Sequence, residues 1–267
     1  MKNIAPDSSW KQSWINSYEY DLIEIYGSNR NLGYTYAYQN RYKEVINLVT
    51  NLVKPGAKIL DIAAAQGNFT LKLAELGYEV TWNDIREELV DYVKMKQQNG
   101  IVNYVSGNVF EIKFKELFDV VLATEVIEHT AHPDQFLYQV ASLVKPGGYL
   151  LVTTPNGEYF MNKLPKFSDC PDSSIYENIQ FKPNSDGHIF LLHLDEVRKL
   201  SQSVGLKIVS LKLITNPLTN GHVKLWMVLK FFPKAAIDFI EQVTKAFPLC
   251  LSKKINTTMC VLFQRPL

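Results

Sequence analysis

The amino-acid sequence predicts a doubly wound α/β fold, in which helices cover both faces of a mostly parallel sheet. Three observations lead to this prediction. From about residue 55, strand-like segments alternate with segments of helical periodicity. The helical segments are roughly 10–15 residues long, the length of crossovers that join parallel strands. Pro133 stands near the start of one predicted helix and Gly147 and Gly148 follow its end, as helix-capping preferences require.

The predicted core runs in chain order from residue 57 to residue 155. It begins with the apolar strand "AKILDIAA" (57–64), followed by the helical segment "GNFTLKLAELG" (67–77). Further strands, which are apolar or alternate in polarity, are expected at 78–84, 102–107, 118–126 and 149–155. Further helices are expected at 86–100 and 133–144, and a turn, "KPGG", at 145–148.

Two regions lie outside this alternation. Seven of the 14 tyrosines fall in residues 17–42, before the core begins. After the core, 206–216 and 256–266 are predicted as strands, and 224–247 as two helices interrupted at Pro233. Four parts are therefore expected: an aromatic-rich cap (1–54), a cofactor-binding core (55–216), a helical insertion (217–254) and a last core strand (255–267).

Composition excludes several classes of protein. Lys and Arg number 28 against 27 Asp and Glu, so no global charge attracts the chain to nucleic acid. The N-terminus lacks the apolar core of a signal peptide, and no apolar run reaches the roughly 18 residues of a transmembrane segment. The three cysteines are not spaced as zinc ligands, so a cytoplasmic location is expected. The apolar stretch "LWMVLKFF" (225–232) permits contact with a membrane surface, although a buried cap helix is favoured.

The ends of the first two strands predict a binding site for a small ligand. Ligands of doubly wound sheets bind beyond the carboxyl ends of the strands. The first strand ends in "DIAAAQGNF" (61–69), whose small residues allow a ligand to approach the backbone, and the second ends in Asp84. An acid there can accept hydrogen bonds from both ribose hydroxyls of an adenosine ligand. The alternative is a tight strand–helix turn and one solvated aspartate.

Taken together, the core segments resemble the class I S-adenosylmethionine-dependent methyltransferases. The nearest group is the small-molecule branch that includes the ubiquinone-biosynthesis O-methyltransferases. The matching segments, in order and at the family's spacing, are 59–69, 80–84, 105–112, 118–129 and 143–157. The resemblance implies a seven-stranded Rossmann-like sheet that binds S-adenosylmethionine, here with a helical insertion before the last strand.

The resemblance also implies a role for individual residues. Asp61, Ala63 and Gly67 would lie near the methionine part of the cofactor, with Thr124 near its sulfonium and Arg41 at its carboxylate. Asp84 would bind the ribose, and Asn108 and Val109 would border the adenine. The chain departs from the family at two points. Ala63 and Ala65 stand where glycines are usual, and Asn108 replaces the usual acid, although its carbonyl can still accept a hydrogen bond.

The segment "ATEVIEHT" (123–130) places three ionisable groups directly after a predicted buried strand. If a helix begins here, Glu125, Glu128 and His129 share one face, because residues at i, i+3 and i+4 are neighbours. Two crowded carboxylates need a compensating positive charge, and oxygen ligands with one imidazole suit Mg²⁺ or Mn²⁺. Alternatively, the glutamates cap the helix N-terminus.

The same E-x-x-E-H pattern is a metal site in the ubiquinone O-methyltransferases that the chain resembles. It also occurs in small-RNA 3′-terminal 2′-O-methyltransferases, where a downstream histidine completes the metal shell. Here "DGHIFLLH" (186–193) supplies His188 and His193, of which His188 is the better match. A second hypothesis is that His129 or His188 acts as a general base without a metal.

The predicted reaction is methyl transfer from S-adenosylmethionine to the hydroxyl of a small molecule, such as a sugar or a natural-product intermediate. An O–H acceptor needs a base or a metal that lowers its pKa, which fits the ionisable groups above. Other candidates are N- or carboxyl-methylation, RNA 2′-O-methylation, which the near-neutral charge disfavours, and a non-catalytic cofactor-binding protein. The tyrosine-rich segment and the insertion helices are expected to form the acceptor pocket. The sequence specifies neither the acceptor nor the oligomeric state.

Overall fold

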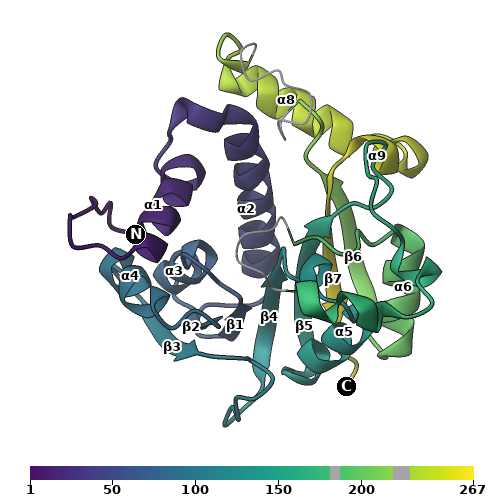
Figure 1. Cartoon of the computed structure of the whole chain (residues 1–267), viewed down its shortest axis with the longest axis horizontal. Coiled ribbons are helices and arrows are strands. Elements are labelled where there is room, and N and C mark those ends of the chain that lie inside the picture. Colours follow the sequence, from purple (N-terminus) through teal and green to yellow (C-terminus); the bar gives the residue numbers. More distant parts are fainter. Residues whose placement is uncertain (181–186, 219–228) are drawn as a thin grey trace.

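The computed structural model describes residues 1–180, 187–218 and 229–267 (Figure 1). It contains a seven-stranded sheet with the strand order β3-β2-β1-β4-β5-β7-β6. Neighbouring strands from β3 to β5 are parallel, whereas β7 runs antiparallel to both β5 and β6. The strands are β1 (Lys58–Ile62), β2 (Glu79–Asp84), β3 (Ile101–Ser106), β4 (Phe118–Thr124), β5 (Val144–Pro155), β6 (Lys207–Ile214) and β7 (Thr258–Gln264). The predicted doubly wound, mostly parallel sheet is confirmed.

Helices cover both faces of the sheet because its central strands are apolar on both sides. On one face, Val45 and Val49 of α2 and Leu73 of α3 pack against Ile59 and Leu122. On the other face, the side chains of α5 and α6 form a second core with the alternate residues of the same strands. The helices are α1 (Gln12–Glu24), α2 (Leu32–Leu52), α3 (Asn68–Glu75), α4 (Leu89–Lys96), α5 (Pro133–Ser142), α6 (Leu194–Ser203), α8 (Lys234–Lys245) and α9 (Leu249–Ile255).

The predicted insertion before the last strand is also confirmed. Strands β6 and β7 are neighbours in the sheet, and the chain between them contains α8 and α9. Buried Glu241 of α8 anchors the insertion by accepting hydrogen bonds from the backbone N–H groups of Thr215 (2.6 Å) and Asn216 (3.2 Å). Most of the helix predicted before Pro233 lies outside the described residues. The division of the chain into four separate parts remains a prediction.

The turn predicted at 145–148 is instead part of β5. Phe118 pairs with Val144, and pairing resumes only at Val120 and Tyr149, so four residues of β5 bulge opposite Asp119. Lys145 donates to Asp119 at 2.7 Å, and Gly147 supplies the left-handed φ of +79° that the bulge needs. The "KPGG" signal therefore marks a bulge within a strand.

An N-terminal cap lies over the β2–β3 side of the sheet. Trp10 and Trp14 pack edge-on against each other and around Tyr92 of α4, and Trp14 donates to the carbonyl of Glu88 at 2.6 Å. Helix α2 continues from the cap across the sheet (Figure 1). Within the described residues, no helix combines the length and apolarity needed to cross a membrane.

Candidate active site

A pocket of about 850 Å³ opens at the carboxyl ends of β1, β2 and β4. Eight of the predicted site residues line it: Arg41, Ala63, Asp84, Asn108, Val109, Thr124, Glu125 and His129. Four others do not line it: Asp61, Gly67, Glu128 and His188. Three residues of the tyrosine-rich segment (17–42) line the pocket, Glu24, Tyr38 and Arg41, and neither α8 nor α9 does. The described part of the insertion therefore does not line this pocket, and a role for it in binding the acceptor remains a prediction.

The loop between β1 and α3 forms the floor of the pocket in a strained conformation. Ala63 and Ala65 adopt positive φ values of 52° and 46°, a region that favours glycine, and Gly67 has φ 72°. A Cβ on Gly67 would lie 2.5 Å from a methyl group of Val93, so only glycine fits there. The loop is fastened to β2, because Ala65 N–H donates to Asp84 (2.9 Å) and Trp82 donates to the Ala65 carbonyl (3.1 Å).

Asp84 has no spare acceptor capacity in this structure. Its carboxylate receives one bond from Ala65 N–H and three from Arg86, through the backbone N–H, Nε and Nη2, all at 2.9 Å. A carboxylate offers about four lone-pair sites, so all are engaged. The Arg86 side chain is 46% exposed and can move away. For Asp84 to bind a ribose, Arg86 has to release it.

Two other predicted cofactor residues differ in their surroundings. Asp61 is fully buried beneath the loop, where it accepts a hydrogen bond from Thr70 Oγ1 at 2.6 Å, and burial raises the pKa of its carboxyl to about 7. It supports the floor of the pocket rather than lining it. Asn108 lines the pocket, but its amide is used locally, donating to Glu111 and accepting from Phe110 N–H.

A buried ionic network ties the cap to this loop, and sequence reasoning missed it. Lys96 and Asp21 are both fully buried and form an ion pair at 2.5 Å. Lys96 also donates to the carbonyl of Gln66 (2.9 Å) and to Asn68 Oδ1 (2.7 Å). Helical spacing could have revealed Lys96, because it continues the apolar face of Leu89, Tyr92 and Val93. Likewise, α1 turns a polar face inward: Ser17, Asp21 and Glu24.

Two ionisable groups lie on the cap side of the pocket, the buried Glu24 and the partly exposed Arg41. Glu24 accepts hydrogen bonds from Tyr34 (2.8 Å) and Asn68 (3.0 Å), and burial raises its pKa to about 7. Arg41 lies over the ring of Tyr38 and pairs with Glu125 at 3.2 Å. Arg41 thus lines the pocket as expected for a cofactor ligand, but Glu125 already holds it.

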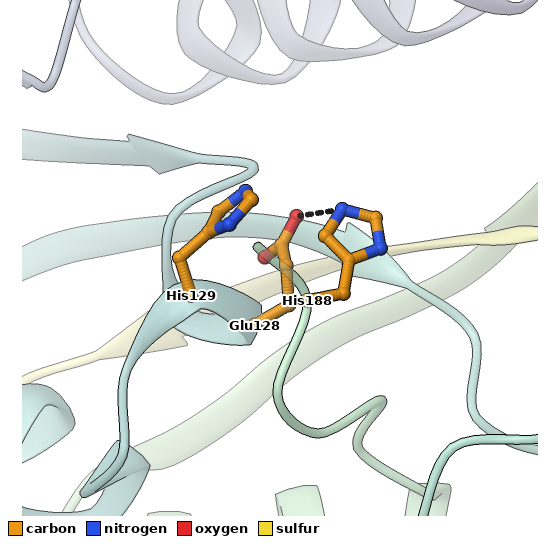
Figure 2. Close-up of side chains that lie close together, drawn as sticks. All are labelled: Glu128, His129 and His188. Atoms are coloured by element: carbon orange, nitrogen blue, oxygen red, sulfur yellow. Dashed lines mark ion pairs between the residues drawn. The ribbon is translucent and has the colours of Figure 1, made fainter. Parts of the chain in front are cut away.

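Glu128, His129 and His188 form a compact group at the end of β4 (Figure 2). One ligand atom from each lies within 4.8 Å of the others. Glu128 is fully buried, and its Oε2 accepts a hydrogen bond from Thr154 at 3.0 Å. Its Oε1 has no hydrogen-bond partner among the described residues, and the nearest basic atom is His188 Nε2 at 4.0 Å. Burial and the charge of Glu125 raise the pKa of Glu128 well above its usual range.

The prediction that Glu125, Glu128 and His129 share one face of a helix is wrong. Glu125 has a left-handed φ of 56°, and a short 3₁₀ turn, η2 (Ile127–His129), replaces the first turn of a helix. Glu125 is thereby directed to Arg41 and to Thr153, which donates to it at 2.8 Å. It is not a member of the metal-ligand group, although its charge still acts on Glu128.

His188 comes from a distant segment that the backbone fastens to η2. Ile189 N–H donates to the carbonyl of Glu128 at 2.7 Å, and Ile189 and Phe190 are buried beside Ala131. The rings of His129 and His188 meet edge to face, with centroids 4.9 Å apart. His193 instead caps α6. A buried carboxylate oxygen that lacks a donor, together with two imidazoles, is a donor set that fits a divalent cation.

Comparisons with known proteins agree with this architecture. The sequence model of the family described as "Methyltransferase domain" matches residues 34–211, which excludes α1. The ubiquinone biosynthesis O-methyltransferase of Rickettsia canadensis is 24% identical over 201 residues, 69% of this chain and 78% of that protein. The Rickettsia prowazekii protein of the same name is 31% identical over 171 residues, 55% of this chain and 67% of its own length.

Solved structures with the same fold are more distant in sequence. Magnesium protoporphyrin IX methyltransferase from Synechocystis, with bound SAH, has a TM-score of 0.59 at 14% identity, covering 95% of each chain. Phosphoethanolamine N-methyltransferase 2 from Haemonchus contortus, in complex with S-adenosyl-L-methionine, also has a TM-score of 0.59 at 17% identity. That match covers 95% of this chain and 57% of the other. At such identities the likeness shows the fold.

Proposed function

Because the chain belongs to the methyltransferase-domain family and is an S-adenosylmethionine-dependent methyltransferase, we propose that it methylates a hydroxyl of a small-molecule acceptor. The observation that carries this proposal is the buried Glu128 carboxylate, whose unpartnered oxygen faces His188 beside the pocket. Ionisable groups at that position suit an acceptor that must lose a proton. The names of the relatives, which are O-methyltransferases, support the same choice.

The cofactor is proposed to lie along the loop between β1 and α3. The small side chains of Ala63 and Ala65 let the methionine part approach the backbone. Asp84 accepts the ribose hydroxyls once Arg86 has moved, while Asn108 and Val109 border the adenine. Arg41 interacts with the carboxylate of the cofactor's methionine part.

The residues of this chain then position the acceptor and remove its proton. S-adenosylmethionine, when bound, supplies a methyl group that the sulfonium already activates. Thr124 and His129 line the pocket at the end of β4, and His129 is the proposed acceptor of the hydroxyl proton. Glu128, His129 and His188 would hold Mg²⁺ or Mn²⁺, and such an ion would lower the pKa of a hydroxyl bound to it. Without a metal, His129 or His188 serves as the general base.

Radiolabelled cofactor distinguishes this proposal from its alternatives. Methyl transfer to phenols or sugars, but not to amines, carboxylates or short RNA, is the expected result. Chelator should abolish turnover and leave cofactor binding unchanged, and Mg²⁺ or Mn²⁺ should restore it. If chelator has no effect, alanine at His129 or His188 should lower kcat roughly 10²–10⁴-fold. Cofactor binding with no transfer to any acceptor class would indicate a non-catalytic protein and contradict the proposal.

A further inference from the structure

The N-terminal cap contributes one acid, Glu24, to the wall of the pocket. Glu24 belongs to α1, which precedes the part of the chain that matches the family model. Only 7% of the residue is exposed, and it lines the pocket together with Arg41 and Asn68. Asn68 is the first residue of α3, directly after the loop that forms the pocket floor. An acid of the cap therefore lies beside the proposed position of the cofactor's methionine part.

Within the described residues, no cationic side chain forms an ion pair with Glu24. Lys96 directs one N–H donor to Asp21 and its other two to the loop carbonyl and the α3 side chain named above, so its three donors are used. Arg41 is paired with Glu125 at 3.2 Å. The charges of Arg41, Lys96 and Asp21 act on Glu24 only through space.

Glu24 is held by neutral donors instead. The Tyr34 hydroxyl donates to its Oε1 at 2.8 Å and the Asn68 amide to its Oε2 at 3.0 Å, which engages two of about four lone-pair sites. Tyr38 also lies near, with a hydroxyl that burial keeps neutral by raising its pKa. Burial outweighs the hydrogen bond from Tyr34 and the distant cations, and raises the pKa of Glu24 to about 7. Glu24 is thus a buried acid with spare acceptor sites and no cation of its own.

The methionine part of S-adenosylmethionine carries a carboxylate and an ammonium group on the same carbon atom. An α-amino group has a pKa of about 8, so it is largely cationic near neutral pH. Arg41 suits the carboxylate, because its buried Nε has no hydrogen-bond partner among the described residues. Resting on the cofactor position proposed above, we propose that Glu24 binds the α-ammonium of S-adenosylmethionine, and that the Glu24 proton passes to solvent as the ammonium binds.

Calorimetry on Glu24→Gln tests this proposal. The amide keeps the size of the side chain but not its charge, so the affinity for S-adenosylmethionine near neutral pH should fall about 10–100-fold. 5′-Methylthioadenosine lacks the amino-acid part and should bind the variant and the unmodified chain alike. Glu19 lies on the same helix with a side chain that is 53% exposed, and it does not line the pocket. Glu19→Gln is therefore the matched control and should bind S-adenosylmethionine with unchanged affinity.

The number of protons released on binding is a second measurement. Titration at about pH 6 in buffers of different ionisation enthalpy counts these protons. The unmodified chain should release close to one proton more per bound S-adenosylmethionine than Glu24→Gln does. The comparison uses the variant because the pKa of Asp61 is also about 7. With 5′-methylthioadenosine the difference between the two proteins should vanish.

Three results would overturn the proposal in different ways. Equal or tighter binding of S-adenosylmethionine by Glu24→Gln would show that no ammonium is bound there. An equal loss of affinity for S-adenosylmethionine and 5′-methylthioadenosine would show that Glu24 only supports the loop. If the unmodified chain bound neither ligand, the proposed cofactor position itself would be contradicted, and the inference with it.

Discussion

The cofactor side and the acceptor side of the pocket differ in how their buried polar groups are paired. On the cofactor side, Lys96 contacts three acceptors and Asp84 accepts four hydrogen bonds. Among the described residues, two buried carboxylate oxygens near the pocket lack a hydrogen-bond partner, Oδ1 of Asp61 beneath the cofactor loop and Oε1 of Glu128 on the acceptor side, and only Glu128 lies in a group with two imidazoles. An unpaired buried carboxylate oxygen is costly, whereas a paired one holds its surroundings in place. A proton can satisfy Asp61, whose pKa burial raises to about 7, whereas the two imidazoles beside Glu128 could share a cation with its carboxylate.

The largest expected effect comes from breaking the buried ion pair between Lys96 and Asp21 on the cofactor side. Lys96→Met leaves Asp21 ionised and buried without its partner, which should lower the free energy of unfolding by about 3–5 kcal/mol. Because Lys96 also holds the carbonyl of Gln66, the affinity for S-adenosylmethionine should fall as well. Urea denaturation and calorimetry measure the two effects.

The double variant Asp21→Leu/Lys96→Met is the control for this experiment. It removes both charges together, and should recover much of the stability but not the affinity. If the single variant were as stable as the unmodified chain, the network would not support the loop.

Asp84→Ala should weaken cofactor binding next most strongly. Loss of two hydrogen bonds from ribose hydroxyls to a charged acceptor costs roughly 3 kcal/mol, or about 100-fold in affinity. Arg86→Ala is the matched control, because it keeps the carboxylate and frees its lone pairs. Calorimetry should show equal or tighter binding for this control, and unchanged affinity of Asp84→Ala would remove Asp84 from the site.

Glu24 predicts a dependence of stability on pH. Its pKa rises from 4.5 in the unfolded chain to about 7 in the fold, so the folded state keeps a proton that the unfolded state loses between these values. The contribution of Glu24 to the free energy of unfolding is therefore fully present below pH 4.5. It declines by roughly 3 kcal/mol as the pH rises to about 7. Relative to the unmodified chain, Glu24→Gln should gain stability between about pH 5 and about pH 8. A difference in unfolding free energy that stays flat over this range would contradict the assignment.

The smallest effect is expected at the strained loop. Ala65→Gly removes a left-handed alanine that costs about 1–2 kcal/mol, but it also adds up to about 1 kcal/mol of unfolded-state entropy. The net change in unfolding free energy should be a gain below about 1 kcal/mol, measured by urea denaturation. Ala64→Gly, at a neighbouring residue that is not left-handed, should instead destabilise the chain.

Sequence reasoning succeeded where the position of a residue follows from the order of elements along the chain. The β1–α3 loop, Asp84 and the segment after β4 were located correctly at the sheet edge, because strand ends in this fold always meet there. It did not foresee that Arg86 occupies Asp84, or that Glu125 turns left-handed toward Arg41. Both depend on pairings between side chains, and periodicity carries no information about them. Asp21 and Lys96 lie 75 positions apart in two helices, and only helical spacing signalled their pairing, through the inward polar face of α1 and the place of Lys96 on the apolar face of α4.

Binding of Mn²⁺ tests the central difference between the two sides most directly. Titration followed by electron paramagnetic resonance should detect one ion per chain in the unmodified protein. Glu128→Gln and His188→Ala should lose this ion, while calorimetry shows that their affinity for S-adenosylmethionine is unchanged. If the unmodified chain binds no Mn²⁺, or if both variants bind it equally well, the acceptor side is not a cation site and the account is contradicted.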